Sequence, residues 1–176
     1  NDGGVYKYNN GVWDAKFNGL TSSQFYHFER ENGNHKIWGG LQDNGHLEQA
    51  SGGNYIEVSG GDGYDQMTDH NYLVSNGTGN TKYFTVNKSI YKNCYTTTSC
   101  VISVPNNDSF FGNLGMSPVE KDRIYVGYQQ AVYRSEDAGS NWSAIGTASG
   151  NWCLAVGRNV GTVYAAGDGI TGQRLF

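Results

Sequence analysis

The sequence is poor in proline and in charge, and it has no long apolar run. Only 2 of its 176 residues are proline, and 16% are charged. No stretch approaches the ~20 consecutive apolar residues that a membrane-spanning helix needs. No segment sustains the apolar period of an amphipathic helix. The net charge of −4 comes without a basic cluster, which argues against a nucleic-acid partner.

Glycine and tyrosine are abundant instead. The chain has 26 glycines and 13 tyrosines, and the glycines separate short runs rich in tyrosine, valine and isoleucine. Such runs are typical of β-strands, and the glycines are typical of the turns between them. The sequence therefore predicts an all-β chain with the length of one ordinary domain.

The cysteines predict one local disulfide. Cys94 and Cys100 bracket a polar loop between apolar runs, so we expect them to be bonded, with a reduced pair as the alternative. Zinc is not expected, because no histidine stands nearby at ligand spacing. Cys153 lies in an apolar run and is expected to be a buried free thiol. The low lysine content and the many small polar residues suit a secreted, extracellular or cell-surface protein.

The segment from Ser135 to Trp142 fits the Asp-box pattern S-x-D-x-G-x-x-W at each defined position. In such a hairpin turn Asp137 accepts backbone N–H groups and Gly139 takes a positive φ. Trp142 begins the next strand and packs beneath the hairpin. Ser135, Asp137, Gly139 and Trp142 are therefore expected to be structural. The pattern indicates a β-propeller or a close relative and assigns no activity.

One strand-like motif recurs along the chain. It occurs at 35–40, 122–127 and 161–166, with a looser copy at 71–75. The copies are roughly 35 to 50 residues apart, which is the length of a propeller blade of about four strands. We therefore predict a single β-propeller domain or segment. Its blades lie at about 24–60, 66–104 and 115–147, with partial blades at 1–20 and 151–176.

The two partial blades leave two arrangements open. They could join into one blade and close a small four-bladed ring. However, segments 5–8 and 173–176 both read as a third strand, which makes that join redundant. We therefore expect a piece of a larger propeller, whose remaining blades or a neighbouring chain would cover the open edges.

The order of several motifs resembles that of bacterial exported BNR/Asp-box propellers. These proteins are similar to the propeller of sortilin-type receptors and to the wider glycosidase-like group. The segments that carry the resemblance are 2–7, 19–21, 24–26, 38–45 and 60–63, together with the Asp box. The resemblance implies an exported propeller without naming a substrate. The arginine triad that sialidases need is not recognisable among the five arginines here.

Two acidic turns are candidate ligand sites. The first is 42–45, after the strand that contains Trp38, and the second is 60–65, between two predicted blades. As a binding rim, they would offer an aromatic ring for stacking on sugars, with amides and carboxylates for hydroxyl groups. As plain turns, Asp43 or Asn44 would accept backbone N–H groups, with Gly45 at positive φ. The candidate ligand-binding residues are Trp38, Gln42, Asp43, Asn44, Asp62, Tyr64 and Asp65.

Asp43, Asp62 and Asp65 also allow two other interpretations. Two facing carboxylates would hydrolyse a glycosidic bond, and a set of oxygen ligands could bind calcium. All three are expected in wet, donor-rich turns, which suit a proton-donating acid poorly. We therefore predict a non-catalytic exported module that binds glycan or protein and needs no cofactor. A glycoside hydrolase domain and a structural component of an extracellular assembly are the alternatives.

Overall fold

The computed structural model describes residues 6–15, 24–31, 35–68, 81–93, 101–105, 113–120, 122–128, 131–147 and 152–167. Within these ranges the chain has sixteen β-strands and one short 3-10 helix, η1 (Ser51–Gly53). The predicted all-β class is therefore confirmed. No helix in the described part of the chain is long and apolar enough to cross a membrane.

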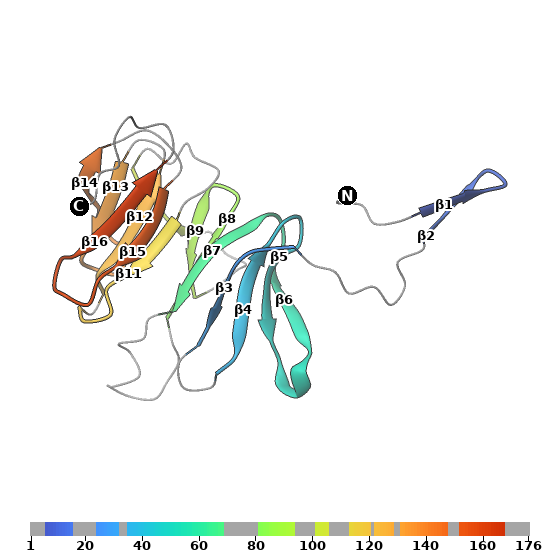
Figure 1. Cartoon of the computed structure of the whole chain (residues 1–176), viewed down its shortest axis with the longest axis horizontal. Coiled ribbons are helices and arrows are strands. Elements are labelled where there is room, and N and C mark those ends of the chain that lie inside the picture. The colour runs from blue at the N-terminus through green and yellow to red at the C-terminus, as the bar shows by residue number, and fades with distance from the viewer. Residues whose placement is uncertain are drawn as a thin grey trace.

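Twelve of the strands form three antiparallel four-stranded sheets, in which strands adjacent in sequence are adjacent in the sheet (Figure 1). The first sheet contains β3 (Phe25–Arg30), β4 (Ile37–Leu41), β5 (Gly45–Gln49) and β6 (Tyr55–Ser59). The second contains β7 (Gly63–Thr68), β8 (Lys82–Val86), β9 (Ser89–Lys92) and β10 (Val101–Ile102). The third contains β11 (Asn113–Met116), β12 (Ile124–Tyr128), β13 (Ala131–Ser135) and β14 (Ser143–Thr147).

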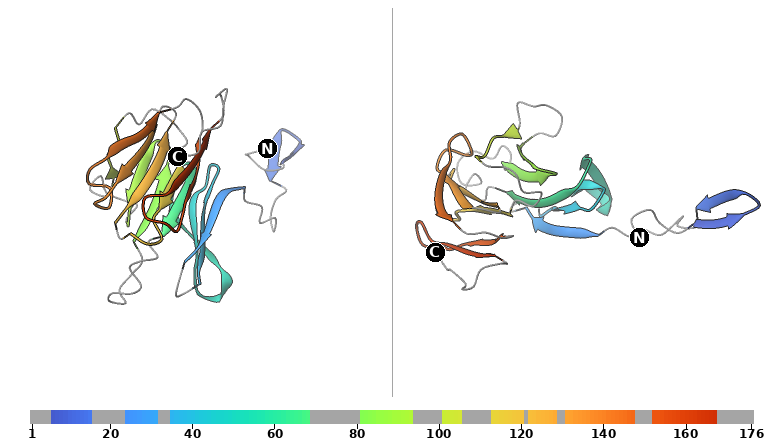
Figure 2. Two further views of the ribbon diagram at one scale, coloured as in Figure 1. Left: turned by 60° about the vertical axis from the view of Figure 1, so that its left-hand side comes forward. Right: turned by 90° about the horizontal axis from the view of Figure 1, so that it is seen from above.

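Two further pairs of strands flank these sheets in sequence. β15 (Trp152–Val156) and β16 (Val163–Gly167) form a two-stranded sheet beside the third sheet. β1 (Tyr6–Asn9) and β2 (Val12–Ala15) form a hairpin that lies apart from the sheets in Figures 1 and 2. Its turn residues Asn10 and Gly11 have φ of 47° and 84°, and two positive φ values are typical of a tight type I′ hairpin turn.

The sheets stand side by side around their first strands. β7 packs against both β3 and β11, and β11 packs against β15, an arrangement visible from above in Figure 2. Glycine allows the first two sheets to approach closely. A Cβ added to Gly40 would lie 2.4 Å from the backbone oxygen of Tyr64, and one added to Gly63 would lie 2.1 Å from that of Gly45. Any larger residue at these positions would push the two sheets apart.

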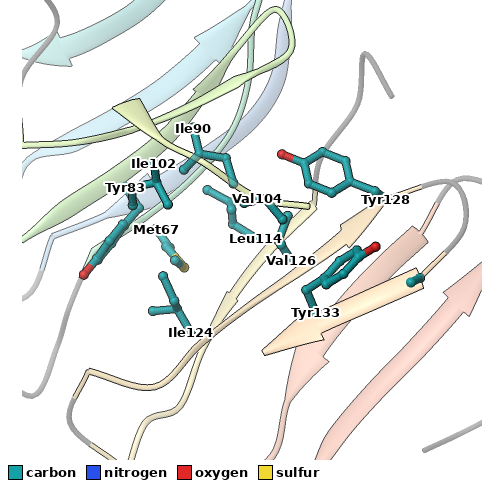
Figure 3. Close-up of a cluster of buried hydrophobic side chains, with 11 residues drawn as sticks. Met67, Tyr83, Ile90, Ile102, Val104, Leu114, Ile124, Val126, Tyr128 and Tyr133 are labelled. Carbon is teal, nitrogen blue, oxygen red and sulfur yellow. The ribbon is translucent and has the colours of Figure 1, made fainter. Parts of the chain in front are cut away.

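Buried apolar clusters join each sheet to the next. The largest lies between the second and third sheets (Figure 3). It consists of Met67, Tyr83, Ile90, Ile102, Val104, Leu114, Ile124, Val126, Tyr128, Ala131 and Tyr133, with Trp142 packed against it. Trp38, Phe84 and Val86 join the first and second sheets. Val132 and Ala165 join the third sheet to the β15–β16 pair.

The recurring motif marks the second strand of a sheet. Its copies at 35–40, 122–127 and 161–166 coincide with β4, β12 and β16. The looser copy at 71–75 lies outside the described residues, and the second strand of the second sheet is β8 instead. Segment 173–176, expected as a third strand, also lies outside the described part.

The cysteine predictions have different outcomes. Cys94 and Cys100, expected to be bonded, lie outside the described residues. Cys153 is a free thiol, but it is exposed, so the prediction of a buried thiol is wrong. Side chains alternate along β15, and Leu154 and Val156 face the third sheet. Cys153 therefore lies on the opposite face.

Candidate functional site

Three polar turns meet at one end of the first and second sheets. They are the β4–β5 turn at 42–44, the β6–β7 connection at 60–62 and the β8–β9 turn at 87–88. The backbone N–H of Asp43 donates to Asp62 Oδ1 at 2.9 Å. The N–H of Asp62 donates to Asn87 Oδ1 at 3.3 Å, and the N–H of Asn87 donates to the Asp62 carbonyl at 2.9 Å. Asp62 thus links the two acidic turns to the second sheet.

The β4–β5 turn differs from the plain turn expected for this segment. Asp43 has φ of 59°, and Gly45 has φ of 61°, which confirms the positive φ predicted for Gly45. Asn44 accepts no turn N–H in this arrangement. Its Nδ2 donates to the Gln42 carbonyl at 2.9 Å. Asp43 and Asn44 are both exposed, so this turn presents an acid and an amide to solvent.

A pair of tyrosines lies beside these turns. The ring centroids of Tyr26, on β3, and Tyr64, on β7, are 4.9 Å apart. Tyr64 is 5% exposed and Tyr26 is 42% exposed. Burial raises the pKa of the Tyr64 hydroxyl, and the charges of Asp62 and Asp43 raise it further. Tyr64 follows Asp62 by two positions, and the N–H of Gln42 in the β4–β5 turn donates to the carbonyl of Gln24, next to β3, at 3.2 Å, so the tyrosines adjoin the acidic turns.

We call this surface the rim patch. It contains two residues that the sequence did not single out, Tyr26 and Asn87. Tyr26 lies at a β-bulge, where the β3–β4 pairing shifts register between Phe25 and His27. A bulge re-aims a side chain in a way that a strand pattern does not reveal. The rim patch consists of Tyr26, Gln42, Asp43, Asn44, Asp62, Tyr64 and Asn87.

Trp38 is not part of the rim patch, so the prediction that it stacks on a sugar is wrong. It is 0% exposed and packs with Phe84 between the first and second sheets. Its Nε1 donates to Thr68 Oγ1 at 3.1 Å, and Lys82 Nζ lies 5.3 Å from the ring centroid. The alternation of side chains along β4 directs Trp38 at the second sheet.

Asp65 is also placed differently from the prediction, because it lies on β7 rather than in a turn and is 8% exposed. Its Oδ1 accepts from the Nδ1–H of His27 and from the N–H of Gln66, the latter at 3.0 Å. Its Oδ2 accepts from the N–H of Leu114 at 2.6 Å. The hydrogen bond to Asp65 raises the pKa of His27 against the opposing effect of burial. Asp65 therefore ties together the first strands of three sheets.

His46 is a core residue. It is 0% exposed, and its ring lies 6.0 Å from that of Trp38 and 5.1 Å from that of Phe84. Its Nδ1 and its backbone N lie 3.2 Å and 3.0 Å from Ser59 Oγ. Burial lowers the pKa of His46 to about 4, so the ring is neutral at pH 7.

The turn at 135–142 has its own internal hydrogen bonds. Asp137 Oδ1 accepts from the N–H of Asn141 and from Ser135 Oγ, both at 2.8 Å, and Oδ2 accepts from Asn141 Nδ2 at 2.6 Å. These bonds, first those from Asn141, lower the pKa of Asp137 to about 2. Gly139 has φ of 92°, as predicted, and its carbonyl accepts from Trp142 Nε1 at 3.1 Å. Such bonds hold the turn and offer no ligand site.

No protein-family model, curated protein or solved structure matches this chain. Among the residues that the structure describes, no group of three histidine, cysteine, aspartate or glutamate side chains is placed to hold a metal ion. What the chain does is therefore inferred from the rim patch itself.

Proposed function

We propose that the sheets are blades of a β-propeller. Three consecutive four-stranded antiparallel sheets, each with its strands in sequence order, support this proposal. So do their first strands, which lie side by side as blades do around a common axis. The resemblance of the sequence to exported BNR/Asp-box propellers favours the same arrangement and an extracellular or cell-surface location.

We further propose that the chain is a non-catalytic module that binds a glycan at the rim patch. The observation that carries this proposal is Tyr26, whose half-exposed ring is backed by the buried ring of Tyr64. An aromatic face of this kind packs against the apolar face of a sugar ring. The exposed side chains of Asp43 and Asn44 lie on the adjoining turn and supply hydrogen-bonding groups for hydroxyls.

The charge of the patch favours a neutral glycan over an acidic one. Asp43 and Asp62 both belong to the patch, and the whole chain carries a net charge of −4. Like charges close together repel, and this repulsion is strongest where water is excluded. Sialosides and uronic-acid polymers would therefore bind less well than neutral polysaccharides.

Binding of soluble neutral polysaccharides, such as xyloglucan and mixed-linkage β-glucan, tests this function. The variants are Tyr26→Ala and the control Tyr55→Ala. Tyr55 lies on the outer strand β6 and is 45% exposed, compared with 42% for Tyr26. We expect Tyr26→Ala to weaken binding about tenfold, which corresponds to roughly 1.4 kcal/mol of stacking energy, and Tyr55→Ala to leave it unchanged. Equal losses in the two variants, or preferred binding of sialosides, would contradict the proposal.

A role in a larger extracellular assembly is the second candidate function. Phe25 and Phe28, on β3, are 39% and 64% exposed, and Tyr164, on β16, is 48% exposed. Exposed apolar side chains on sheet faces are typical of surfaces that pack against another element. A protein ligand at these faces is the corresponding alternative to a glycan.

A further inference from the structure

The second strand of each sheet carries an aromatic side chain that faces the next sheet. Trp38 on β4, Tyr83 on β8 and Tyr125 on β12 are 0%, 1% and 1% exposed. Tyr164 occupies the equivalent position on β16 and is 48% exposed. The sheet that begins with β15 and β16 therefore lacks, among the described residues, the covering that its three counterparts have.

The two faces of the β15–β16 pair differ in exposure. Val163 and Ala165, on the face toward the third sheet, are 3% and 1% exposed. The opposite face is exposed, yet among the described residues its side chains offer only the Tyr164 hydroxyl and the Cys153 thiol as polar groups. Sheet faces that meet water normally carry polar residues. The exposed face consists of Cys153, Ala155, Tyr164 and Ala166.

The β1–β2 hairpin has one aromatic face and one polar face. Its register places Tyr8 opposite Trp13, and Lys7 opposite Asp14. Tyr8 and Trp13 are 59% and 67% exposed, and their ring centroids are 4.9 Å apart. An isolated two-stranded hairpin is marginally stable in water, so this hairpin needs a sheet on which to dock.

We propose that the β1–β2 hairpin supplies the third and fourth strands of the sheet that β15 and β16 begin, with β1 paired to the edge of β16. The completed sheet then has four strands, as the other three have, and the four sheets close into a ring. Closure covers the face around Tyr164 with the outer face of the first sheet, where Phe25 and Phe28 are exposed. This inference depends on the propeller arrangement proposed above.

The connection between β2 and β3 is long enough for this closure. Nine residues, 16–24, separate the two strands, and an extended connection of that length spans at most about 33 Å. A four-stranded sheet is only about 15 Å wide from its first strand to its fourth. The ten-residue connection at 103–112 already joins an outer strand, β10, to the first strand of the next sheet, β11.

Closure within one chain also covers three exposed surfaces together. They are the aromatic face of the hairpin, the face around Tyr164 and the outer face of the first sheet.

Hydrogen exchange of the full chain, combined with alkylation of Cys153 followed by peptide mass spectrometry, tests the closure. The variants are Trp13→Lys and the control Val12→Lys. These neighbours are 67% and 65% exposed but lie on opposite faces of the hairpin. In the monomeric wild type we expect the hairpin amides and the Cys153 thiol to react at least about tenfold more slowly than in the unfolded chain. Trp13→Lys should abolish both protections, and Val12→Lys should preserve them.

Three results would overturn the closure. They are hairpin amides and a Cys153 thiol that react at unfolded rates in the wild type, equal effects of the two lysine substitutions, and a dimer by light scattering in which the hairpins are exchanged between chains. The glycan-binding proposal is tested independently of the closure, because the rim patch lies on the first and second sheets and not on the hairpin. Trp13→Lys should therefore leave any Tyr26-dependent binding intact.

Discussion

Asp65 joins the first strands of three neighbouring sheets. Its carboxylate accepts hydrogen bonds from His27, Gln66 and Leu114, which lie on three neighbouring first strands. Asp65→Asn replaces one acceptor oxygen with an NH2 group that faces N–H donors. We expect a loss of about 1–3 kcal/mol in the free energy of unfolding, measured by urea denaturation. The control Asp62→Asn keeps its acceptor Oδ1 in an exposed turn and should change stability by less than about 0.5 kcal/mol.

The buried His46 makes stability depend on pH. Its folded pKa of about 4 lies below the ordinary value of 6.5, so between these pH values the unfolded chain binds a proton that the folded chain excludes. The stability it contributes is complete above pH 6.5 and is lost as the pH falls toward 4, by roughly 3 kcal/mol in total. His46→Phe should remove this dependence in urea titrations at pH 7 and pH 5. The exposed His35→Asn is the control and should retain it.

His27 acts in the opposite direction and in a different pH range. Its raised pKa stabilises the fold below pH 6.5, and this contribution is lost as the pH rises through the raised value. The two histidines can therefore be separated experimentally. If the loss of stability between pH 6.5 and pH 4 persisted in His46→Phe, this loss could not be assigned to His46.

The sequence predicted the acidic turns but not which aromatic residue lies beside them. Trp38 and Tyr26 both belong to strands of the first sheet, and both are typical strand residues. The burial of Trp38 depends on the second sheet, which covers its face of β4, and the orientation of Tyr26 depends on a bulge. Both are tertiary effects that local pattern does not encode. Asp65 was misplaced for a related reason, since strand β7 begins at Gly63, inside a segment rich in turn residues.

At the scale of the elements, the 135–142 turn should be stabilised by its own carboxylate. The pKa of Asp137 is lowered from 3.8 to about 2 by hydrogen bonds, first those from Asn141. The stability that the ionised Asp137 contributes to the fold is present above pH 3.8 and is lost as the pH falls through about 2. We expect Asp137→Ala to lower the melting temperature at pH 7 and to have little effect near pH 2. Glu136→Ala, 56% exposed on the same turn, should change it less.

The first and second sheets are also joined by buried charges. Lys82 Nζ, on β8, contacts Glu31 and lies 2.7 Å from Glu48 Oε2, and Glu31 is 2% exposed. Removing the lysine takes a cation away from the buried carboxylate of Glu31. Lys82→Ala should therefore cost about 3–5 kcal/mol of unfolding free energy by chemical denaturation. Lys36→Ala is the control, because Lys36 contacts the same Glu48 but is 40% exposed, and it should cost at most about 1 kcal/mol.

The closer copies of the recurring motif correctly predicted strands. The copies at 35–40, 122–127 and 161–166 each coincide with the second strand of a sheet. In the second sheet this strand is β8, whose run Lys-Tyr-Phe-Thr-Val lacks the glycines or alanines of the other copies. Segment 71–75 therefore resembles the motif more than β8 does. Apolar alternation identifies a strand, but it does not say where in a sheet that strand lies.

At the scale of the whole molecule, repetition predicts the sheets but not their closure. Each sheet is specified by contacts between neighbours in sequence, which a repeat reveals. The proposed closure needs contacts between β1 and β16, which are separated by most of the chain. Such contacts leave no local pattern beyond an exposed apolar face on each side. For that reason the sequence alone favoured a piece of a larger propeller over a closed ring, and the proposed closure departs from that expectation.

The last prediction concerns catalysis by the whole molecule. Glycoside hydrolysis needs one carboxyl group that donates a proton and a second, ionised carboxylate across the sugar. Asp65 is held by three donors on the inner strands, and Asp62 accepts from the N–H of Asp43. Both carboxylates serve as hydrogen-bond acceptors within the protein, and Asp65 is only 8% exposed, so this pair is not free to act across a sugar. We therefore expect no turnover of chromogenic β-glucosides, sialosides or β-glucan. Turnover that disappears in Asp43→Asn, with the fold intact by circular dichroism, would instead identify the chain as a glycoside hydrolase.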